Sequence, residues 1–111
     1  MKEENCIFCK IVSKEIPANL YYEDTDFIAF LDINPVSRGH TLLVPKNHYR
    51  WFTDLPDDLY NKMFQTAKVL STKIKDEYGA DYVRLSIVGK DVAHTHIHLI
   101  PQKMTDQGPQ A

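Results

Sequence analysis

The sequence predicts a single α+β domain in which a largely antiparallel sheet packs against one long helix, with a short helix at the N-terminus. Short stretches rich in aliphatic and aromatic residues, bounded by turn residues, recur along the chain and are typical of strands. One longer segment has its apolar residues every three or four positions, which indicates an amphipathic helix. We place this domain at residues 1–101, followed by a polar, Gln-rich C-terminal tail at residues 102–111 that we expect to be mobile unless a partner orders it.

The first predicted elements are the short helix and a hairpin. Residues 6–13 (CIFCKIVS) predict the helix, and Pro17 ends the segment after it. LYYE at 20–23 and DFIAFLD at 26–32 predict two strands joined by a tight turn at residues 24–25. Because apolar residues occupy both faces of the second strand, we expect it to be central in the sheet.

The remaining elements are three strands and the long helix. HTLLVP at 40–45, YVRLSIVG at 82–89 and AHTHIHLIP at 93–101 predict the strands. The helix extends from about residue 56 to residue 78, and Gly79 stands where a helix C-cap is expected. Its apolar positions are Leu59, Met63, Ala67, Leu70 and Ile74. Lysines on the opposite side predict a solvated face.

Composition and charge narrow the classes of function. A net charge of −2 argues against a domain that holds nucleic acid by neutralising phosphates, but is compatible with a small nucleotide. No apolar stretch approaches the length of a membrane span, and the acidic start MKEENC differs from a signal peptide. We therefore expect a cytoplasmic protein that binds neither nucleic acid nor a membrane.

Cys6 and Cys9 form a C-x-x-C pair. In a reducing compartment this spacing is typical of half a metal site or of a redox pair, and less often of a structural disulfide. Two thiols that act only as small buried hydrophobes are also compatible with it. The motif alone does not decide among these functions.

Three of the five histidines, His94, His96 and His98, occupy alternate positions of AHTHIHLIP. In a strand they share one face, while the intervening residues share an opposite face that can enter the core. Such a row fits structural histidines, a metal site or nucleophilic catalysis. For catalysis at phosphorus, the central His96 is the predicted nucleophile, His98 binds oxygens of the transferred group, and His40 is expected to reach the same place.

The segment H-T-H-I-H-L-I resembles the H-φ-H-φ-H-φ-φ signature of the histidine triad (HIT) superfamily, with Thr95 a polar residue at the first φ position. The chain also resembles the Hint-like branch of that superfamily in IFCKIVSKEIPA, YYEDTDFIAFLDINP and GHTLLVPKNH. These stretches follow the family's order and cover most of residues 6–101. The resemblance implies a HIT-like fold and a homodimer in which the sheets of two protomers join.

The resemblance also implies a purine nucleotide site and an activity. His96 corresponds to the nucleophile, His98 and His40 to its phosphate-binding partners, and Asp32 to the carboxylate that accepts hydrogen bonds from ribose hydroxyls. The implied function is a nucleotidyl hydrolase or transferase that cleaves purine nucleoside phosphoramidates or related phosphoanhydrides, such as dinucleoside polyphosphates, through a covalent nucleotidyl-histidine intermediate. The expected base pocket consists of Ile7, Phe8, Ile11, Phe30, Leu31, Ile33 and Leu42.

Zinc-bearing members of the superfamily use a C-x-x-C pair and two histidines as tetrahedral ligands. The matching residues here are Cys6, Cys9, His48 and His94, a complete Cys2His2 shell for a structural zinc ion. The alternative is a metal-free site in which His94 hydrogen-bonds within the histidine row.

The chain departs from the family pattern just before the triad. Members of this branch usually carry Gly-Gln-Ser/Thr-Val there, after a longer loop with an Asn that contacts the phosphate region. This chain has Gly89-Lys90-Asp91-Val92, and Ser86 is the candidate replacement for the Asn. Lys90 adds a positive charge near the expected leaving group, unless Asp91 pairs with it. Because the hydroxyl that would assist the leaving group is missing, the alternative function is a nucleotide-binding adaptor with little or no turnover.

Overall fold

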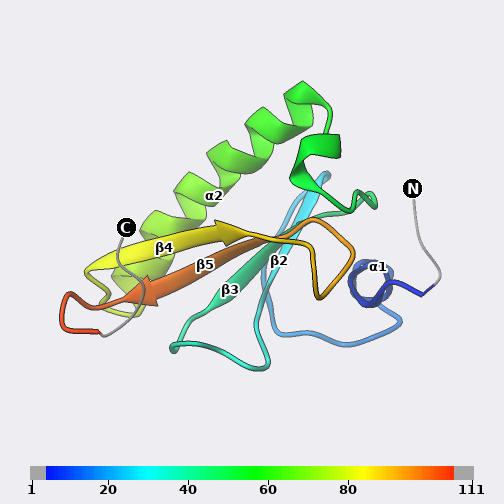
Figure 1. Ribbon diagram of the computed structural model, residues 1–111. Coiled ribbons are helices and arrows are strands. Elements are labelled where there is room, and N and C mark those ends of the chain that lie inside the picture. Colours follow the sequence, from blue (N-terminus) through cyan, green and yellow to red (C-terminus); the bar gives the residue numbers. More distant parts are fainter. Residues whose placement is uncertain (1–4, 107–111) are drawn as a thin grey trace.

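Five strands form one sheet with a helix packed on each face (Figure 1). The computed structural model describes residues 5–106, so residues 107–111 of the predicted tail lie outside the described residues. The elements are α1 (Ile7–Val12), β1 (Leu20–Glu23), β2 (Phe27–Leu31), β3 (Thr41–Pro45), the 3-10 helix η1 (Phe52–Asp54), α2 (Asp57–Glu77), β4 (Tyr82–Ile87) and β5 (Ile97–Gln102). The strand order is β1-β2-β3-β5-β4, and every neighbouring pair is antiparallel. The predicted α+β fold class is confirmed.

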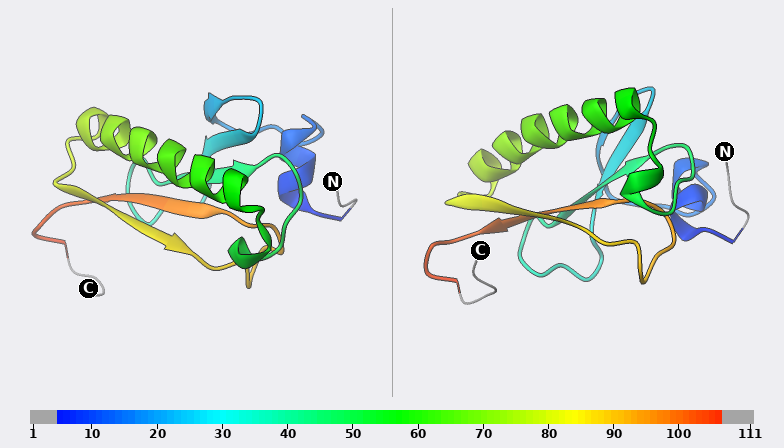
Figure 2. Two further views of the ribbon diagram at one scale, coloured as in Figure 1. Left: turned by 90° about the horizontal axis from the view of Figure 1, so that it is seen from above. Right: turned by 45° about the horizontal axis from the view of Figure 1, so that its top comes forward.

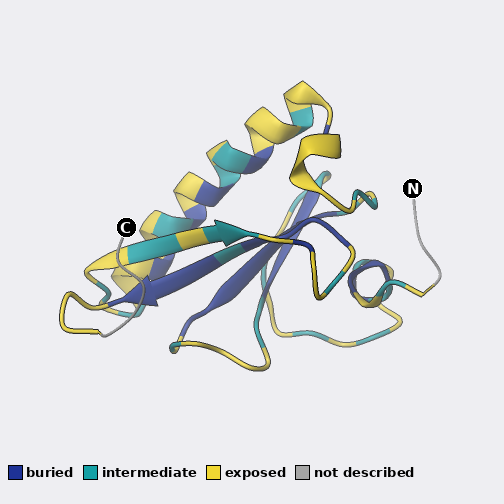
Figure 3. Cartoon of the chain, in the orientation of Figure 1, coloured by how far each residue is buried: buried dark blue, intermediate teal, exposed yellow. Residues whose placement is uncertain are grey.

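The long helix α2 packs on one face of the sheet, and its outward side is exposed (Figure 3). Each Leu, Ile, Phe or Met side chain buried there stabilises the fold by roughly 1.5–3 kcal/mol. The core between α2 and the sheet consists of Met63, Ala67, Leu70 and Ile74 from the helix and Phe27, Ala29, Leu43, Ile97 and Leu99 from the strands, with Leu55 before the helix. Among the described residues, no helix is both long and apolar enough to cross a membrane.

The alternate residues of β2 and β3 point to the other face, where α1 packs at a distance from α2 (Figure 2). This second core contains Phe8, Ile11, Ile28, Phe30, Leu42 and Val44. The apolar residues on both faces of β2 are therefore explained by two separate cores. The strand is interior, as expected from its sequence, although β3 and not β2 is the middle strand of the five.

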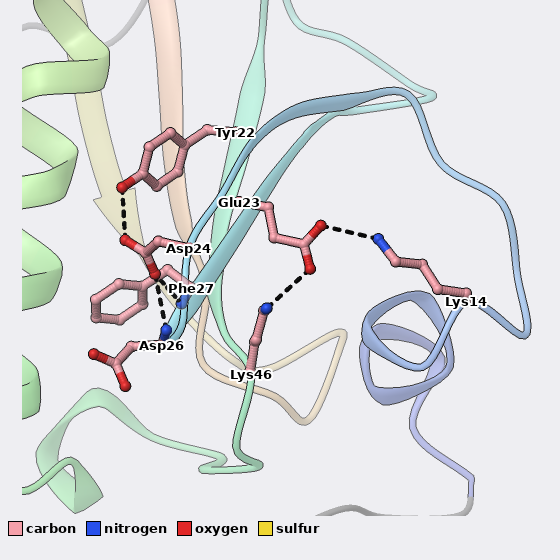
Figure 4. A network of polar contacts seen from close by, with 7 residues as sticks. All are labelled: Lys14, Tyr22, Glu23, Asp24, Asp26, Phe27 and Lys46. Atoms are coloured by element: carbon pink, nitrogen blue, oxygen red, sulfur yellow. Dashed lines mark hydrogen bonds and ion pairs between the residues drawn. The ribbon is translucent and has the colours of Figure 1, made fainter.

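A polar network fixes the β1–β2 hairpin and joins it to the segment after α1 (Figure 4). Asp24 accepts hydrogen bonds from the backbone N–H groups of Asp26 and Phe27 at 2.8 and 2.7 Å. Glu23 forms ion pairs with Lys14 at 3.0 Å and with Lys46 at 2.9 Å. Each exposed pair contributes little by itself, but together they connect the hairpin to the segments after α1 and after β3.

The predicted strand over residues 93–101 is wrong at both ends, because β5 comprises Ile97–Gln102. The backbone N–H of Thr95 donates to the carbonyl of Tyr49 at 2.5 Å, so the segment before β5 hydrogen-bonds to the loop after β3 and not to a neighbouring strand at this point. Of the three histidines in the row, only His98 therefore lies in a strand. Beyond the strand, the N–H of Met104 donates to Asp81 at 2.8 Å, so the first residues of the predicted mobile tail are held in a turn.

Gly39 offers a test of the packing before β3. Its φ is +93°, and an added Cβ would lie 2.6 Å from a ring carbon of Tyr78. Gly39→Ala is expected to lower the free energy of unfolding by about 2–4 kcal/mol, because left-handed strain and a steric clash add. Gly79→Ala is the matched control, since its φ is +62° but its Cβ would meet only the Lys103 ammonium at 3.9 Å. Equal losses for the two variants in urea denaturation would contradict the role of the Tyr78 contact.

Candidate active site and metal centre

A cavity of about 330 Å³ opens on the α1 face of the sheet. All seven residues predicted for the base pocket line it, together with Asp32, His96 and His98. Five further residues of the wall were not predicted from the sequence, although three of them lie after α1 in the stretch IFCKIVSKEIPA, which resembles the family. These five are Ile16, Pro17, Ala18, Asp91 and Val92. The result is an apolar cavity with a carboxylate and two imidazoles on its wall, as expected of a small-molecule site.

His96 is almost fully buried, with 5% of its surface exposed. Its Nδ1 lies 2.7 Å from the backbone carbonyl of His94. A carbonyl only accepts, so Nδ1 carries the proton of the neutral ring, and the lone pair of that tautomer is on Nε2. The ring of Phe8 stands edge-on to the imidazole at a centroid distance of 5.0 Å and fixes its orientation.

His98 and His40 form a hydrogen-bonded pair beside His96. His40 Nε2 lies 3.0 Å from His98 Nδ1, and the His98 ring centroid is 4.8 Å from that of His96. Burial lowers the pKa of His40, against the opposing effect of Asp32. Burial, together with the neighbouring His96 and His40, lowers the pKa of His98 to about 4. Both imidazoles are therefore neutral at pH 7.

Asp32 follows directly after β2, at the edge of the cavity. Its Oδ1 accepts a hydrogen bond from the N–H of Asn34 at 2.9 Å, and its Oδ2 lies 3.5 Å from His40 Nε2. The carboxylate remains partly exposed, with 19% of its side-chain surface accessible. It therefore keeps free acceptor capacity toward the cavity.

The structure does not bring Ser86 and Lys90 to the wall of this cavity. Ser86 lies opposite His98 in the β4–β5 ladder, and Lys90 is exposed outside the cavity. Asp91 lines the cavity instead, and also a neighbouring hollow of about 430 Å³ that Arg50 borders. Within residues 5–106 no ion pair joins Lys90 to Asp91.

The four predicted metal ligands converge beside the cavity. Cys6 is the N-cap of α1, and its Sγ accepts from the N–H of Cys9 at 3.3 Å, so both sulfurs lie at the first turn. The loop after β3 supplies His48, and the segment before β5 supplies His94. All four ligand atoms lie within 4.8 Å of one another.

The donor atoms suit a tetrahedral zinc ion. His94 Nδ1 lies 3.2 Å from Cys6 Sγ and 3.5 Å from Cys9 Sγ, and His48 Nδ1 lies 3.4 Å from Cys9 Sγ. Zn–S and Zn–N bonds of about 2.3 and 2.05 Å at tetrahedral angles require a sulfur to nitrogen separation of about 3.5 Å. His94 Nε2 donates to the carbonyl of Pro45 at 2.8 Å, which leaves the lone pair on Nδ1, toward the sulfurs. The residues therefore fit the metal.

The protein-family model described as HIT domain matches residues 13–105 of the chain. The chain belongs to the HIT family. It is 45% identical over 101 residues to an uncharacterised HIT-like protein of Methanocaldococcus jannaschii, covering 87% of this chain and 78% of the relative. It is 38% identical over 104 residues to the adenosine 5′-monophosphoramidase of Saccharomyces cerevisiae, covering 93% and 66% of the two chains.

A solved HIT structure agrees in fold with this chain. The zinc-bound histidine triad family protein of Mycobacterium smegmatis superimposes with a TM-score of 0.86 at 36% sequence identity, covering 93% of this chain and 78% of that one. The predicted membership of the HIT superfamily and the HIT-like fold are thus confirmed. Hydrolases are found among the HIT relatives, which supports a hydrolase in general terms.

The half-buried imidazole of His98 predicts a loss of stability in acid. Its pKa is about 4 in the folded protein against 6.5 in the unfolded chain, so only the unfolded state gains a proton as the pH falls through this window. The free energy of unfolding therefore falls as the pH decreases from about 6.5 to about 4. His98→Gln is expected to reduce this fall by at most about 3 kcal/mol, at about 1.4 kcal/mol per pKa unit. Urea denaturation across this range measures it, and identical pH dependence in both proteins would contradict the assignment.

Proposed function

We propose that this HIT protein is a nucleotidyl hydrolase or transferase that acts on purine nucleoside phosphoramidates or related phosphoanhydrides. The observation that carries the proposal is the state of His96. Its Nδ1–H donates to the His94 carbonyl, so the neutral ring has its lone pair on Nε2, and the residue lies on the wall of an apolar cavity. A buried, oriented imidazole with a free lone pair is suited to nucleophilic attack on phosphorus.

The cavity provides separate places for the parts of a nucleotide. Its apolar walls hold a base largely by burial, with little readout of the base edge. The Asp32 carboxylate accepts hydrogen bonds from the two ribose hydroxyls. This arrangement leaves the α-phosphate beside His96 and His98, with His40 behind them.

The reaction proceeds in two displacements at the same phosphorus. His96 Nε2 forms a bond to the α-phosphorus while the bond to the leaving amine, phosphate or carboxylate breaks, and the leaving group takes its electron pair. A leaving amine also takes up a proton from water as it departs. Water then attacks the phosphorus, the N–P bond breaks, and its electron pair returns to Nε2; the nucleoside monophosphate and a proton are released. His98 binds the phosphoryl oxygens during both steps, and His40 contacts His98 from behind.

Replacement of His96 distinguishes this enzyme from a nucleotide-binding adaptor. His96→Ala is expected to abolish hydrolysis of adenosine 5′-phosphoramidate, because the covalent step is lost, while AMP affinity changes by less than about tenfold. Product analysis by chromatography and calorimetric titration measure the two quantities. Unchanged turnover in the variant would exclude His96 as the nucleophile. Binding without turnover in the wild type would favour the adaptor.

We propose further that Cys6, Cys9, His48 and His94 hold a structural zinc ion. The sulfur to nitrogen distances and the Nε2–H of His94 support this ligand set. Bound zinc would supply a crosslink between α1, the loop after β3 and the segment before β5. The thiolates and imidazoles of this shell take no part in the reaction.

The zinc proposal predicts about one zinc ion per chain in the purified protein. The double variant Cys6→Ser, Cys9→Ser should lose the metal and melt at a lower temperature, because the complete four-ligand shell, which binds zinc most tightly, exists only in the folded protein. His98→Gln, which changes a half-buried histidine outside the shell, is the control and should retain zinc. Atomic emission analysis and thermal denaturation measure both properties. Zinc retained after both cysteines are replaced would show that the ligands are wrongly assigned.

We also propose a cytoplasmic homodimer that joins through β4. This strand is an edge of the sheet, and Tyr82, Leu85 and Val88 are exposed along it or directly after it. An open, partly apolar edge favours pairing with a second copy. Sedimentation should therefore give a dimer, and Leu85→Lys should shift it toward monomer. A monomeric wild type at all dilutions would contradict this assembly.

A further inference from the structure

The loop before β3 directs a backbone N–H at a buried imidazole. The N–H of Val36 lies 3.1 Å from His40 Nδ1, whereas the Val36 side chain is 61% exposed. The loop itself is held by three hydrogen bonds: Asp32 N–H to the His40 carbonyl at 2.9 Å, His40 N–H to the Ser37 carbonyl at 3.1 Å, and the Ser37 hydroxyl to the Pro101 carbonyl at 2.5 Å. The amide is therefore fixed in its place.

This contact determines where the protons lie on two histidines. A backbone amide only donates, so His40 Nδ1 accepts and the proton of neutral His40 lies on Nε2. The Asp32 carboxylate, 3.5 Å from Nε2, favours the same position. His40 Nε2–H then donates to His98 Nδ1 at 3.0 Å. The remaining proton of neutral His98 is consequently on Nε2.

The two imidazoles on the cavity wall thus differ in polarity. His96 has its proton on Nδ1 and a lone pair on Nε2, whereas His98 has its proton on Nε2. One neighbour can attack phosphorus while the other donates to the phosphoryl oxygens. If the His40 tautomer were reversed, His98 Nε2 would become a lone pair and would repel those oxygens.

We propose that the backbone N–H of Val36 is the positioning group that sets the tautomers of His40 and His98, and so makes His98 a hydrogen-bond donor to the substrate. The substrate part of this proposal rests on the proposed function; the tautomers do not. The group acts through two imidazoles without touching the nucleotide.

The same arrangement argues against a metal ion at this cluster. Asp32, His40 and His98 place their ligand atoms within 4.8 Å of one another, as a metal site would. A metal ligand needs a lone pair on His40 Nε2, which would force the proton onto Nδ1, against the N–H of Val36. The donor pattern therefore favours a hydrogen-bonded relay.

Nitrogen NMR of the histidines tests the proposal directly. In the zinc-loaded wild type at neutral pH, long-range ¹H–¹⁵N correlation spectra of ¹⁵N-histidine protein should show His40 and His98 protonated on Nε2 and His96 on Nδ1. Val36→Pro removes the N–H donor, so the Nε2–H form of His40 should lose its dominance and His98 should change with it. Val36→Ala keeps the N–H and should keep the wild-type tautomers.

Turnover of adenosine 5′-phosphoramidate by Val36→Pro should fall about 100-fold relative to Val36→Ala, mainly in kcat, as expected for loss of one oriented donor. A wild type with His40 protonated on Nδ1, or on both nitrogens, overturns the proposal even if Val36→Pro does not fold. Wild-type tautomers in a folded Val36→Pro protein overturn it as well. If the wild type has the expected tautomers but cleaves no phosphoramidate, the proposed function fails and the tautomer assignment stands.

Discussion

The packing of α1 against β2 and β3 is the constraint on which both candidate sites depend. A helix of six residues is too short to be stable alone, so its position depends on the contacts it makes. Phe8 provides these contacts, with Phe30 at a centroid distance of 5.5 Å and His96 at 5.0 Å. The helix presents apolar side chains to the cavity, and the two sulfurs at its first turn contact His48 and His94. Any movement of α1 therefore alters both sites.

Burial also explains how several imidazoles can lie in contact, because it favours their neutral form. Charged imidazoles in contact would repel one another, and removal from water disfavours the charged form of each. His94 illustrates the effect, because burial lowers its pKa to about 4 despite the favourable hydrogen bond to Pro45. Neutral rings have one donor and one acceptor nitrogen, so backbone groups can assign a distinct role to each ring. The row of histidines thereby becomes three different chemical groups.

Local pattern was sufficient for most elements, because β1, β2, β3 and α2 each carry their own periodicity and turn residues. The resemblance supplied the cavity residues, which periodicity alone cannot separate from core residues. The start of β5 could not be predicted, because alternation continues through His94 and His96 while the break depends on the distant carbonyl of Tyr49. Whether Asp91 or Lys90 faces the cavity depends on the direction of the loop after Gly89. Gly89 has a φ of +97°, and an added Cβ there would lie 2.9 Å from the carbonyl oxygen of Arg50, so the direction of this loop depends on a glycine.

The spacing of the four proposed zinc ligands along the chain has a consequence for the order of folding. Cys6 and Cys9 are three residues apart, so they can bind a zinc ion jointly in a chain that has no other structure. His94 is 88 residues from Cys6, and His48 is 39 residues from Cys9. Closing these long loops costs entropy that only the assembled sheet repays. Zinc binding during folding should therefore occur in two kinetic phases. The two cysteines capture the ion rapidly, and the two histidines complete the shell slowly, as β5 joins the sheet.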